Sequence, residues 1–233
     1  MNTKKKFSFS KDYLAYIIVI GAFIIVQAMN ATGMMTNQIK GLLIPACVYV
    51  IGAISLNLVV GISGELSLGH AGFMCIGAFF SATFSKIIGD GMPAIPRFII
   101  ALLIGAIAAS IFGILIGIPV LRLKGDYLAI VTLAFGEIIK NLMNIIYLGK
   151  DAEGLHFALT DPSKLKMAAD GEFIINGPQG ISGTPKNASF IIGIILILVT
   201  LFIVLNLINS RTGRAIMAIR DNRIAAESVG LDV

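Results

Sequence analysis

Residues 190–208 read FIIGIILILVTLFIVLNLI, a run of 19 residues without a charged side chain. A helix needs about 20 predominantly apolar residues to cross the hydrocarbon of a bilayer, so this run predicts a membrane-spanning helix. Helices satisfy their own backbone groups in lipid, and no segments of alternating polarity suggest a β-barrel. We therefore predict an all-α, polytopic transmembrane helical bundle with about six spans, at Tyr13–Met29, Leu42–Val60, Ala71–Ile88, Phe98–Ile118, Tyr127–Tyr147 and Phe190–Ile208.

The composition of the chain excludes an ordinary soluble domain. Hydrophobic residues make up 57% of the 233 residues and charged residues only 13%, with a mean hydropathy of +0.91. A soluble domain carries about a quarter charged residues and could not bury so much apolar surface in one core. Cys47 and Cys75 lie inside apolar runs, so they are interpreted as packing residues rather than a disulfide or a metal site. No basic stretch interleaved with aromatic residues indicates nucleic-acid binding.

The basic residues predict the orientation of the spans. The first apolar run follows a lysine cluster, as in a secretory signal, but it is long for a signal and lacks a clean cleavage site, so we expect an uncleaved span. By the positive-inside rule, a cytoplasmic N-terminus is favoured and both ends lie in the cytoplasm of a cell-membrane protein. Ten basic residues then lie inside, namely Lys4, Lys5, Lys6, Lys11, Arg122, Lys124, Arg211, Arg214, Arg220 and Arg223, and seven outside, namely Lys40, Lys86, Arg97, Lys150, Lys164, Lys166 and Lys186.

Small residues recur every four positions along two of the spans. They would let helix backbones approach closely in lipid, so we expect one packed bundle and a single transmembrane domain over residues 1–233, with spans and loops at 13–208. The residues are Ala101, Gly105, Ala109, Gly113 and Gly117 in the fourth span and Gly77, Ser81 and Ser85 in the third.

Two connections between spans are unusual. Residues 61–72, GISGELSLGHAG, are rich in glycine and small polar residues. At membrane depth such a stretch is tolerated where it lines a cavity or is buried in protein, as in the broken helices of transporters. Residues 148–189 form a long loop, predicted to face outward, with the turn-rich segment NGPQGISGTP at 176–185. Loops of this length are usually functional or disordered.

No motif in the sequence indicates an enzyme, a cofactor or a metal. His70 and His156 have no carboxylate or cysteine at metal-ligand spacing, and no phosphate-binding glycine loop occurs. Glu65 and His70 are interpreted either as a gate or substrate-adjacent cluster or as an interfacial turn. Glu137 and Lys140 lie three residues apart within the fifth span, where they could line a translocation path or form an ion pair near the membrane boundary.

The C-terminal segment 210–233, SRTGRAIMAIRDNRIAAESVGLDV, differs in kind from the spans. Ile216, Ile219, Arg220, Arg223 and Glu227 recur at helical spacing, with too little apolar length to cross a membrane. This pattern predicts either a solvated interfacial helix or a docking element for a cytoplasmic partner.

Four of these motifs together resemble a known family. Residues 55–73, SLNLVVGISGELSLGHAGF, and 123–139, LKGDYLAIVTLAFGEII, are similar to the signature segments of the branched-chain amino-acid permeases of ABC importers, as are residues 176–185 and 210–230. The order of the motifs is that of the family, and the chain most resembles the member of the permease pair with the long outer loop.

The resemblance implies an ATP-driven importer in which this chain is not an enzyme. A second permease subunit, ATP-binding cassette ATPase subunits that use the ATP, and an extracytoplasmic solute-binding protein would be its partners in the lipid bilayer. The substrate path is then expected at Gly64, Glu65, Ser67, Gly69, His70, Thr132 and Glu137. The cytoplasmic coupling segment would contact the ATPase through Arg214, Arg220, Asp221, Ala225, Ala226, Glu227 and Gly230.

The chain also departs from the family pattern. Ala225, Ala226 and Gly230 fit the Ala-Ala-x-x-x-Gly part of the coupling motif, whereas Ile224 stands where a glutamate is common. Glu65 stands where glutamine is common, which could change the charge of the path. The family normally continues with further spans, so we expect a C-terminally truncated member. An ion-coupled secondary transporter using Glu65, Glu137 and Lys140, or an importer permease for sugars, amides or nucleosides, are the alternatives.

Overall fold

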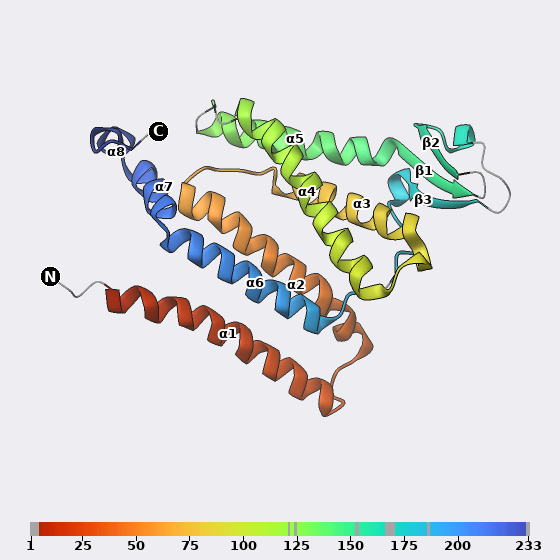
Figure 1. Cartoon of the computed structure of the whole chain (residues 1–233), viewed down its shortest axis with the longest axis horizontal. Coiled ribbons are helices and arrows are strands. Elements are labelled where there is room, and N and C mark those ends of the chain that lie inside the picture. The colour runs from red at the N-terminus through yellow and green to blue at the C-terminus, as the bar shows by residue number, and fades with distance from the viewer. Residues whose placement is uncertain are drawn as a thin grey trace. The chain divides into compact units, whose positions relative to one another are not determined.

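The computed structural model describes residues 5–231, apart from residues 121, 124, 152–153, 166–170 and 186 (Figure 1). Several predicted positions therefore lie outside the described residues, namely Lys4, Lys124, Lys166, Lys186 and residues 232–233 of the C-terminal segment. By their contacts the helices and strands divide into two compact units, one of Met1–Glu65 with Ala188–Val233 and one of Leu66–Asn187. The single domain expected for residues 1–233 stays a prediction.

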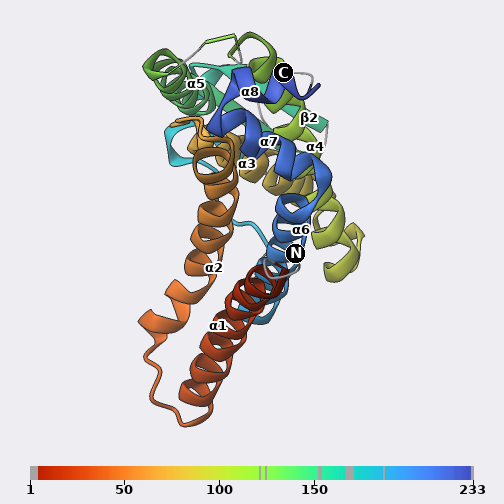
Figure 2. The same cartoon turned by 90° about the vertical axis from the view of Figure 1, so that its left-hand side faces the viewer.

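The first unit is built on three long helices followed by two short ones. Helix α6 packs against both α1 and α2, and α7 turns from the end of α6 toward the end of α2 (Figures 1 and 2). The elements are α1 (Lys5–Ala31), α2 (Asn37–Asn57), the π-helical turn η1 (Leu58–Ser63), α6 (Phe190–Asn209), α7 (Arg211–Asp221) and α8 (Arg223–Ser228).

The core of this unit lies between α2 and α6. Cys47, Ile197 and Leu201 are buried together there. A Cβ on Gly193 would lie 2.8 Å from the sulfur of Cys47, so a glycine is needed where the two helices meet. Cys47 thus packs as a small apolar residue, which confirms its interpretation from the sequence.

The second unit combines three helices with a small sheet. Three antiparallel strands, in the order β2-β1-β3, follow directly on the last helix (Figure 1). The elements are α3 (His70–Ile88), the 3₁₀ turn η2 (Gly89–Gly91), α4 (Ala94–Val120), α5 (Asp126–Ile145), β1 (Ile146–Asp151), β2 (Gly154–Leu159), η3 (Pro162–Leu165), β3 (Glu172–Asn176) and η4 (Gly177–Gln179).

Small residues bring α3 and α4 together, as their spacing predicted. Ala101 and Gly105 are buried on the face of α4 that meets α3. A Cβ on Gly105 would lie 2.6 Å from the carbonyl oxygen of Gly77 and 3.2 Å from the Cβ of Ser81. A buried cluster beside this crossing, Ile76, Ala108, Phe135, Ile139 and Met143, joins α3, α4 and α5.

The six predicted spans are confirmed as helices that are long and apolar enough to cross a membrane. Their bounds are Tyr13–Ala31, Asn37–Ser63, His70–Ile88, Ala94–Val120, Asp126–Ile145 and Phe190–Asn209. Many of their large apolar side chains are exposed, for example Ile95 and Tyr127 at more than 70%. Such surface requires a lipid or protein cover.

The fifth span ends earlier than predicted, because a strand begins inside the stretch assigned to it. The helix stops at Ile145, and Tyr147 pairs with Ala158 of β2 and Asn176 of β3. Isoleucine and tyrosine are common in strands as well as in apolar helices. The prediction from apolar length therefore assigned Tyr147 to the helix, whereas it belongs to β1. The sheet itself, within the predicted loop at 148–189, was missed.

Candidate functional site

The second span ends in a break fixed by two glycines. Gly64 closes η1 in the left-handed conformation, with φ of 76°. The backbone N–H groups of Gly64 and Glu65 both donate to the carbonyl oxygen of Val59, which satisfies a carbonyl at the helix end. A Cβ on Gly61 would collide with the side chain of Asn57. The glycine-rich stretch is therefore a capped helix end followed by irregular backbone as far as Gly69.

Helix α7 contacts this capped end through one arginine. The Arg220 Nη1 donates to the carbonyl oxygen of Gly61 at 2.7 Å. Its Nε and Nη2 donate to Oδ1 of Asp221 at 3.0 and 2.8 Å. The aliphatic part of the same side chain lies over Gly64, where a Cβ would be 2.5 Å from the Arg220 Cγ. Arg220, predicted for ATPase coupling, thus lies over Gly64, predicted for the substrate path, and Asp221 contacts Arg220.

In the second unit, the segment before α3 lies against α5 at Thr132. The backbone N–H of Leu68 donates to the Thr132 hydroxyl at 3.0 Å, and that hydroxyl donates to the carbonyl oxygen of Ala129 at 3.0 Å. A Cβ on Gly69 would lie 2.6 Å from the Thr132 carbonyl oxygen. The structure therefore brings together two of the predicted path residues, Gly69 and Thr132, both of which are buried.

Three other predicted path residues lie along the same stretch of chain. Ser67 is half-buried in the irregular segment, and His70 is half-buried as the first residue of α3. Glu65 is exposed at the end of the first unit. Within the second unit, the half-buried Ser67 and His70 lie on either side of the buried Gly69 in the chain, and their side chains can offer hydrogen-bonding groups to a polar solute.

Glu137 does not join this group in the second unit. It lies about 140° around α5 from Thr132, as five residues at 3.6 per turn require, and its side chain is 56% exposed. The Lys140 Nζ lies 3.2 Å from its Oε2, with the lysine side chain 64% exposed. The predicted ion pair is present in the described chain. Its side chains face away from the buried side of α5, where Thr132, Phe135 and Ile139 lie.

The predicted coupling segment folds as two capped helices. Ser210 begins α7 by accepting a hydrogen bond from the Gly213 N–H at 3.0 Å, and Asn222 begins α8 by accepting one from the Ala225 N–H at 3.1 Å. A Cβ on Gly213 would collide with the last carbonyls of α6, so a glycine is required at this corner. Sequence reasoning did not single out these three residues, although Ser and Asn before a helix are ordinary capping signals.

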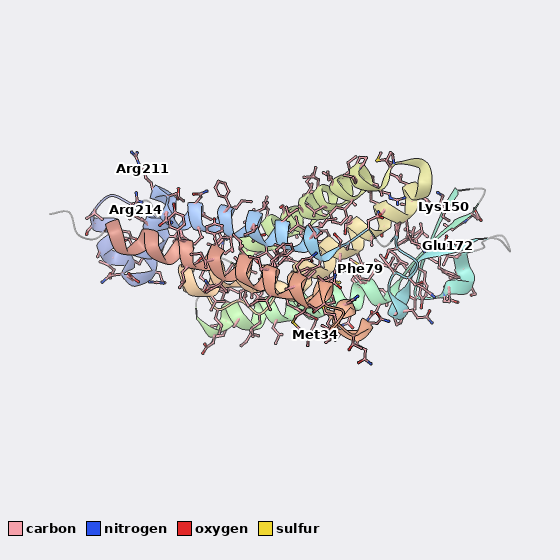
Figure 3. The ribbon with its side chains drawn as sticks, turned by 90° about the horizontal axis from the view of Figure 1, so that it is seen from below. Met34, Phe79, Lys150, Glu172, Arg211 and Arg214 are labelled. Carbon is pink, nitrogen blue, oxygen red and sulfur yellow. The ribbon has the colours of Figure 1, made fainter. Side chains whose placement is uncertain are left out.

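The remaining coupling residues are distributed along these helices. Ala226 is buried in α8, whereas Arg214, Ala225, Glu227 and Gly230 are exposed. The Arg214 Nη1 donates to the carbonyl oxygen of Asn209 at 2.7 Å, which ties α7 to the end of α6. Glu227 accepts from Arg223 at 3.4 Å. In Figure 3, Arg211 projects away from the ribbon at the start of α7.

Two lysines join the sheet of β1, β2 and β3 to the end of α3, and sequence reasoning missed both roles. The Lys86 side chain is only 6% exposed, and its Nζ donates to the carbonyl oxygen of Phe173 at 2.7 Å and lies 3.0 Å from Glu172. The Lys150 Nζ donates to the carbonyl oxygen of Ile87 at 2.7 Å. Figure 3 shows Lys150 and Glu172 on the sheet. A lysine in the last turn of a helix was the only local signal, since cations favour that end.

Within the described ranges, no group of three or more His, Cys, Asp or Glu side chains lies close enough to hold a metal ion. His156 and Asp151 form a pair at 2.9 Å in the β1–β2 hairpin. A pair of this kind within one hairpin stabilises the sheet.

Comparison with known proteins gives the family. Residues 38–233 match the family model described as "Branched-chain amino acid transport system / permease component". The chain belongs to this family. The match begins in the first turn of α2 and takes in both the capped break at Gly64 and its contact with Arg220.

Two relatives of this permease chain are the same protein from different bacteria. It is 35% identical over 200 residues to the high-affinity branched-chain amino acid transport system permease protein LivM of Escherichia coli K12, and 31% identical over 218 residues to LivM of Salmonella typhimurium LT2. Each alignment covers 79% of this chain and 44% of the relative. The permease chain therefore spans less than half the length of these curated relatives.

A third relative of the permease chain carries a different description. It is 30% identical over 238 residues to the fructose import permease protein FruG of Bifidobacterium longum NCC 2705, covering 99% of this chain and 64% of the relative. No solved structure gives a significant match. The family is thus shown by sequence, and the chain is a multi-pass membrane component of a transport system.

Proposed function

We propose that this chain is the membrane-spanning subunit of an ATP-driven importer for branched-chain amino acids. One observation carries the proposal. Within a single family match, α7 of the coupling segment holds the capped end of the broken second span through Arg220 and Gly61. Helix α7 lies outside the spans and contacts the broken end of one of them. A partner that displaces α7 would therefore also displace this part of the transport path.

The partners in this proposal follow from the division of labour in such importers. ATP is hydrolysed by separate ATP-binding cassette subunits that dock on α7 and α8. A second permease subunit completes the path, and an extracytoplasmic binding protein delivers the solute. Arg214, Ala225, Glu227 and Gly230 are exposed on α7, α8 and the turn after them, so they are open to a docking partner.

The path is proposed to include residues of both units that precede and follow the break in the sequence. Gly64, Glu65, Ser67, Gly69 and His70 occupy one stretch of irregular backbone and the first turn of α3. Thr132 supports that stretch from α5 through its hydrogen bond to Leu68. Glu137 belongs to the proposed path as a second polar residue of α5, on the exposed side of the helix away from Thr132.

Orientation is part of the same proposal. Six spans place both ends of the chain on one side of the membrane, and in Figure 1 the first turns of α1 and the end of α6 lie at the same end of the first unit. The positive-inside rule assigns that side to the cytoplasm. The sheet of β1, β2 and β3 then lies outside, where a binding protein would meet it.

A sugar is the second candidate substrate, since FruG aligns with 99% of the chain. The two substrates can be separated by uptake into proteoliposomes that contain the full-length protein and the subunits encoded beside it. We expect uptake of labelled leucine that requires ATP and is competed by isoleucine and valine but not by fructose. Competition by fructose, and not by isoleucine or valine, would show that the proposed substrate is wrong. The proposal of an ATP-driven importer would still stand.

The energy source is tested in the same vesicles. An ATPase subunit with its phosphate-binding lysine replaced should abolish uptake, because that residue is needed for hydrolysis. Dissipating the proton and sodium gradients should leave uptake unchanged. Uptake that survives loss of the ATPase and collapses with a gradient would replace the importer by an ion-coupled transporter.

A further inference from the structure

We propose that Arg220 is a positioning residue that links α7 to the broken end of the second span, so that a displacement of α7 moves Gly64 and Glu65. The inference rests on the proposed function, because it gives that movement its use in transport. It also changes the role expected for Arg220, from an outward contact with the ATPase to an internal link within this chain.

The guanidinium group is held in place from two sides. Asp221 accepts hydrogen bonds from Nε and Nη2 at one carboxylate oxygen, which fixes the plane of the group. The remaining Nη1 then points at the carbonyl oxygen of Gly61 at 2.7 Å. Arginine can make these contacts at once because its donors form a rigid fork, whereas lysine offers one ammonium group.

The contact is made at the end of a helix, where it is electrostatically favourable. The last carbonyls of a helix lack partners within it, and they carry the negative end of the helix dipole. Gly61 supplies such a carbonyl near the end of η1, and Arg220 brings a positive charge to it. The link therefore combines a charge with a directed hydrogen bond.

The aliphatic part of Arg220 makes a second contact with the same turn. A Cβ on Gly64 would lie 2.5 Å from the Arg220 Cγ and 2.8 Å from its Cδ. The side chain thus lies directly over the residue that reverses the chain. Gly64 and Glu65 in turn donate their N–H groups to Val59. A displacement of Arg220 therefore disturbs the backbone hydrogen bonds that close the helix end.

Amide hydrogen exchange tests the contact on the full-length protein in nanodiscs. Arg220→Ala should raise exchange at the amides of Gly64 and Glu65 by about two- to fivefold, as expected for loss of one solvent-exposed charged contact. Arg211→Ala is the matched control, since Arg211 starts the same helix and projects away from it, and its exchange should equal that of the wild type. Unchanged exchange in Arg220→Ala would overturn the link.

Coupling is tested on the assembled importer by the number of solute molecules taken up per ATP hydrolysed. Arg220→Ala should lower this ratio by about fivefold or more while ATP hydrolysis continues, and Arg220→Lys should restore part of it. An Arg220→Ala complex that keeps the wild-type ratio would overturn the coupling role. So would a loss of uptake and hydrolysis in equal proportion, which is the result expected of an ATPase contact.

Two further results distinguish failure of the Arg220 contact from failure of the proposed function. If Arg220→Ala does not assemble, Asp221→Ala removes the oxygen that accepts from Nε and Nη2 while the guanidinium keeps its charge, and a lower ratio is again expected. If the wild-type complex shows no ATP-dependent uptake, the importer proposal fails together with the coupling role. The exchange measurement still decides whether Arg220 holds the cap.

Discussion

The hydroxyl of Thr132 accepts a hydrogen bond from the backbone N–H of Leu68 at 3.0 Å while it donates to the carbonyl oxygen of Ala129. One buried side chain of α5 therefore fixes the irregular segment that leads into α3. The segment has no backbone partner at Leu68 in a helix or strand of its own, so this hydroxyl takes the place of secondary structure at that point.

Replacing this hydroxyl by a methyl group should loosen the segment. Thr132→Val keeps the volume of the side chain but removes the acceptor of the part-buried hydrogen bond from the Leu68 N–H, a net loss of about 0.5–1.5 kcal/mol. We expect a lower thermal unfolding temperature and weaker solute uptake. Thr132→Ser keeps the hydroxyl and should stay closer to the wild type in both measurements. Equal behaviour of the two variants would show that the hydrogen bond contributes little.

Close contact between α3 and α4 should depend on Gly105. The Cβ of Gly105→Ala would lie 2.6 Å from the backbone oxygen of Gly77, so the helices have to separate. Such overpacking costs about 1–3 kcal/mol, seen as a lower unfolding temperature in detergent. Gly117→Ala is the control on the same helix, because nothing lies within 4 Å of its added Cβ. A stable Gly105→Ala would mean that the small-residue face does not set the helix separation.

The sequence predicted the helices well because apolar length is a strong signal, and it predicted the face of Gly105 because a four-residue spacing is regular. It missed the sheet because β1, with Leu148 next to Gly149 and Lys150, does not alternate apolar and polar residues. These strands are defined by hydrogen bonds to one another, and β3 lies more than 20 residues after β1 in the sequence. The Arg220–Gly61 contact joins residues 159 positions apart, so no motif could show it.

Part of the candidate site was predictable because some of its residues carry a local sequence signal. Gly64 and Gly69 stood out because glycine clusters mark breaks, and Thr132 entered through a family motif. Their partners were not predicted, since Thr132 and Leu68 are 64 residues apart. Glu137 was singled out by its charge within an apolar span, but charge alone does not say which side of the helix a residue occupies.

Lys86 should fix the sheet of β1, β2 and β3 to α3. Lys86→Met removes a nearly buried ammonium group together with its hydrogen bond to the carbonyl oxygen of Phe173, a charged hydrogen bond of about 1.5–3 kcal/mol. We expect faster amide exchange in β3. Glu172→Gln removes only an ion pair with a carboxylate that is 74% exposed, worth about 0–1 kcal/mol. If both variants accelerated exchange equally, the ion pair would be the dominant contact.

Two left-handed glycines allow the contact with Arg220 to be separated from backbone strain. Gly64 and Gly230 have φ of 76° and 83°, and alanine at either position costs about 1–2 kcal/mol. Only Gly64 has a close neighbour, the Arg220 side chain, whereas nothing lies within 4 Å of a Cβ on Gly230.

Gly64→Ala should therefore disturb the cap more than the strain alone requires. We expect faster exchange at the Glu65 amide in Gly64→Ala and an unchanged rate there in Gly230→Ala, because the second substitution is remote from the break. A bulky residue at Gly230 should instead abolish coupling in the assembled importer without preventing insertion, since that glycine is exposed beside α8, where the proposed ATPase subunit would dock. An unchanged exchange rate at the Glu65 amide in Gly64→Ala would mean that the turn and Arg220 adjust to the added Cβ at little cost. ATP-driven uptake that is unchanged by a bulky residue at Gly230 would place the partner's contact elsewhere.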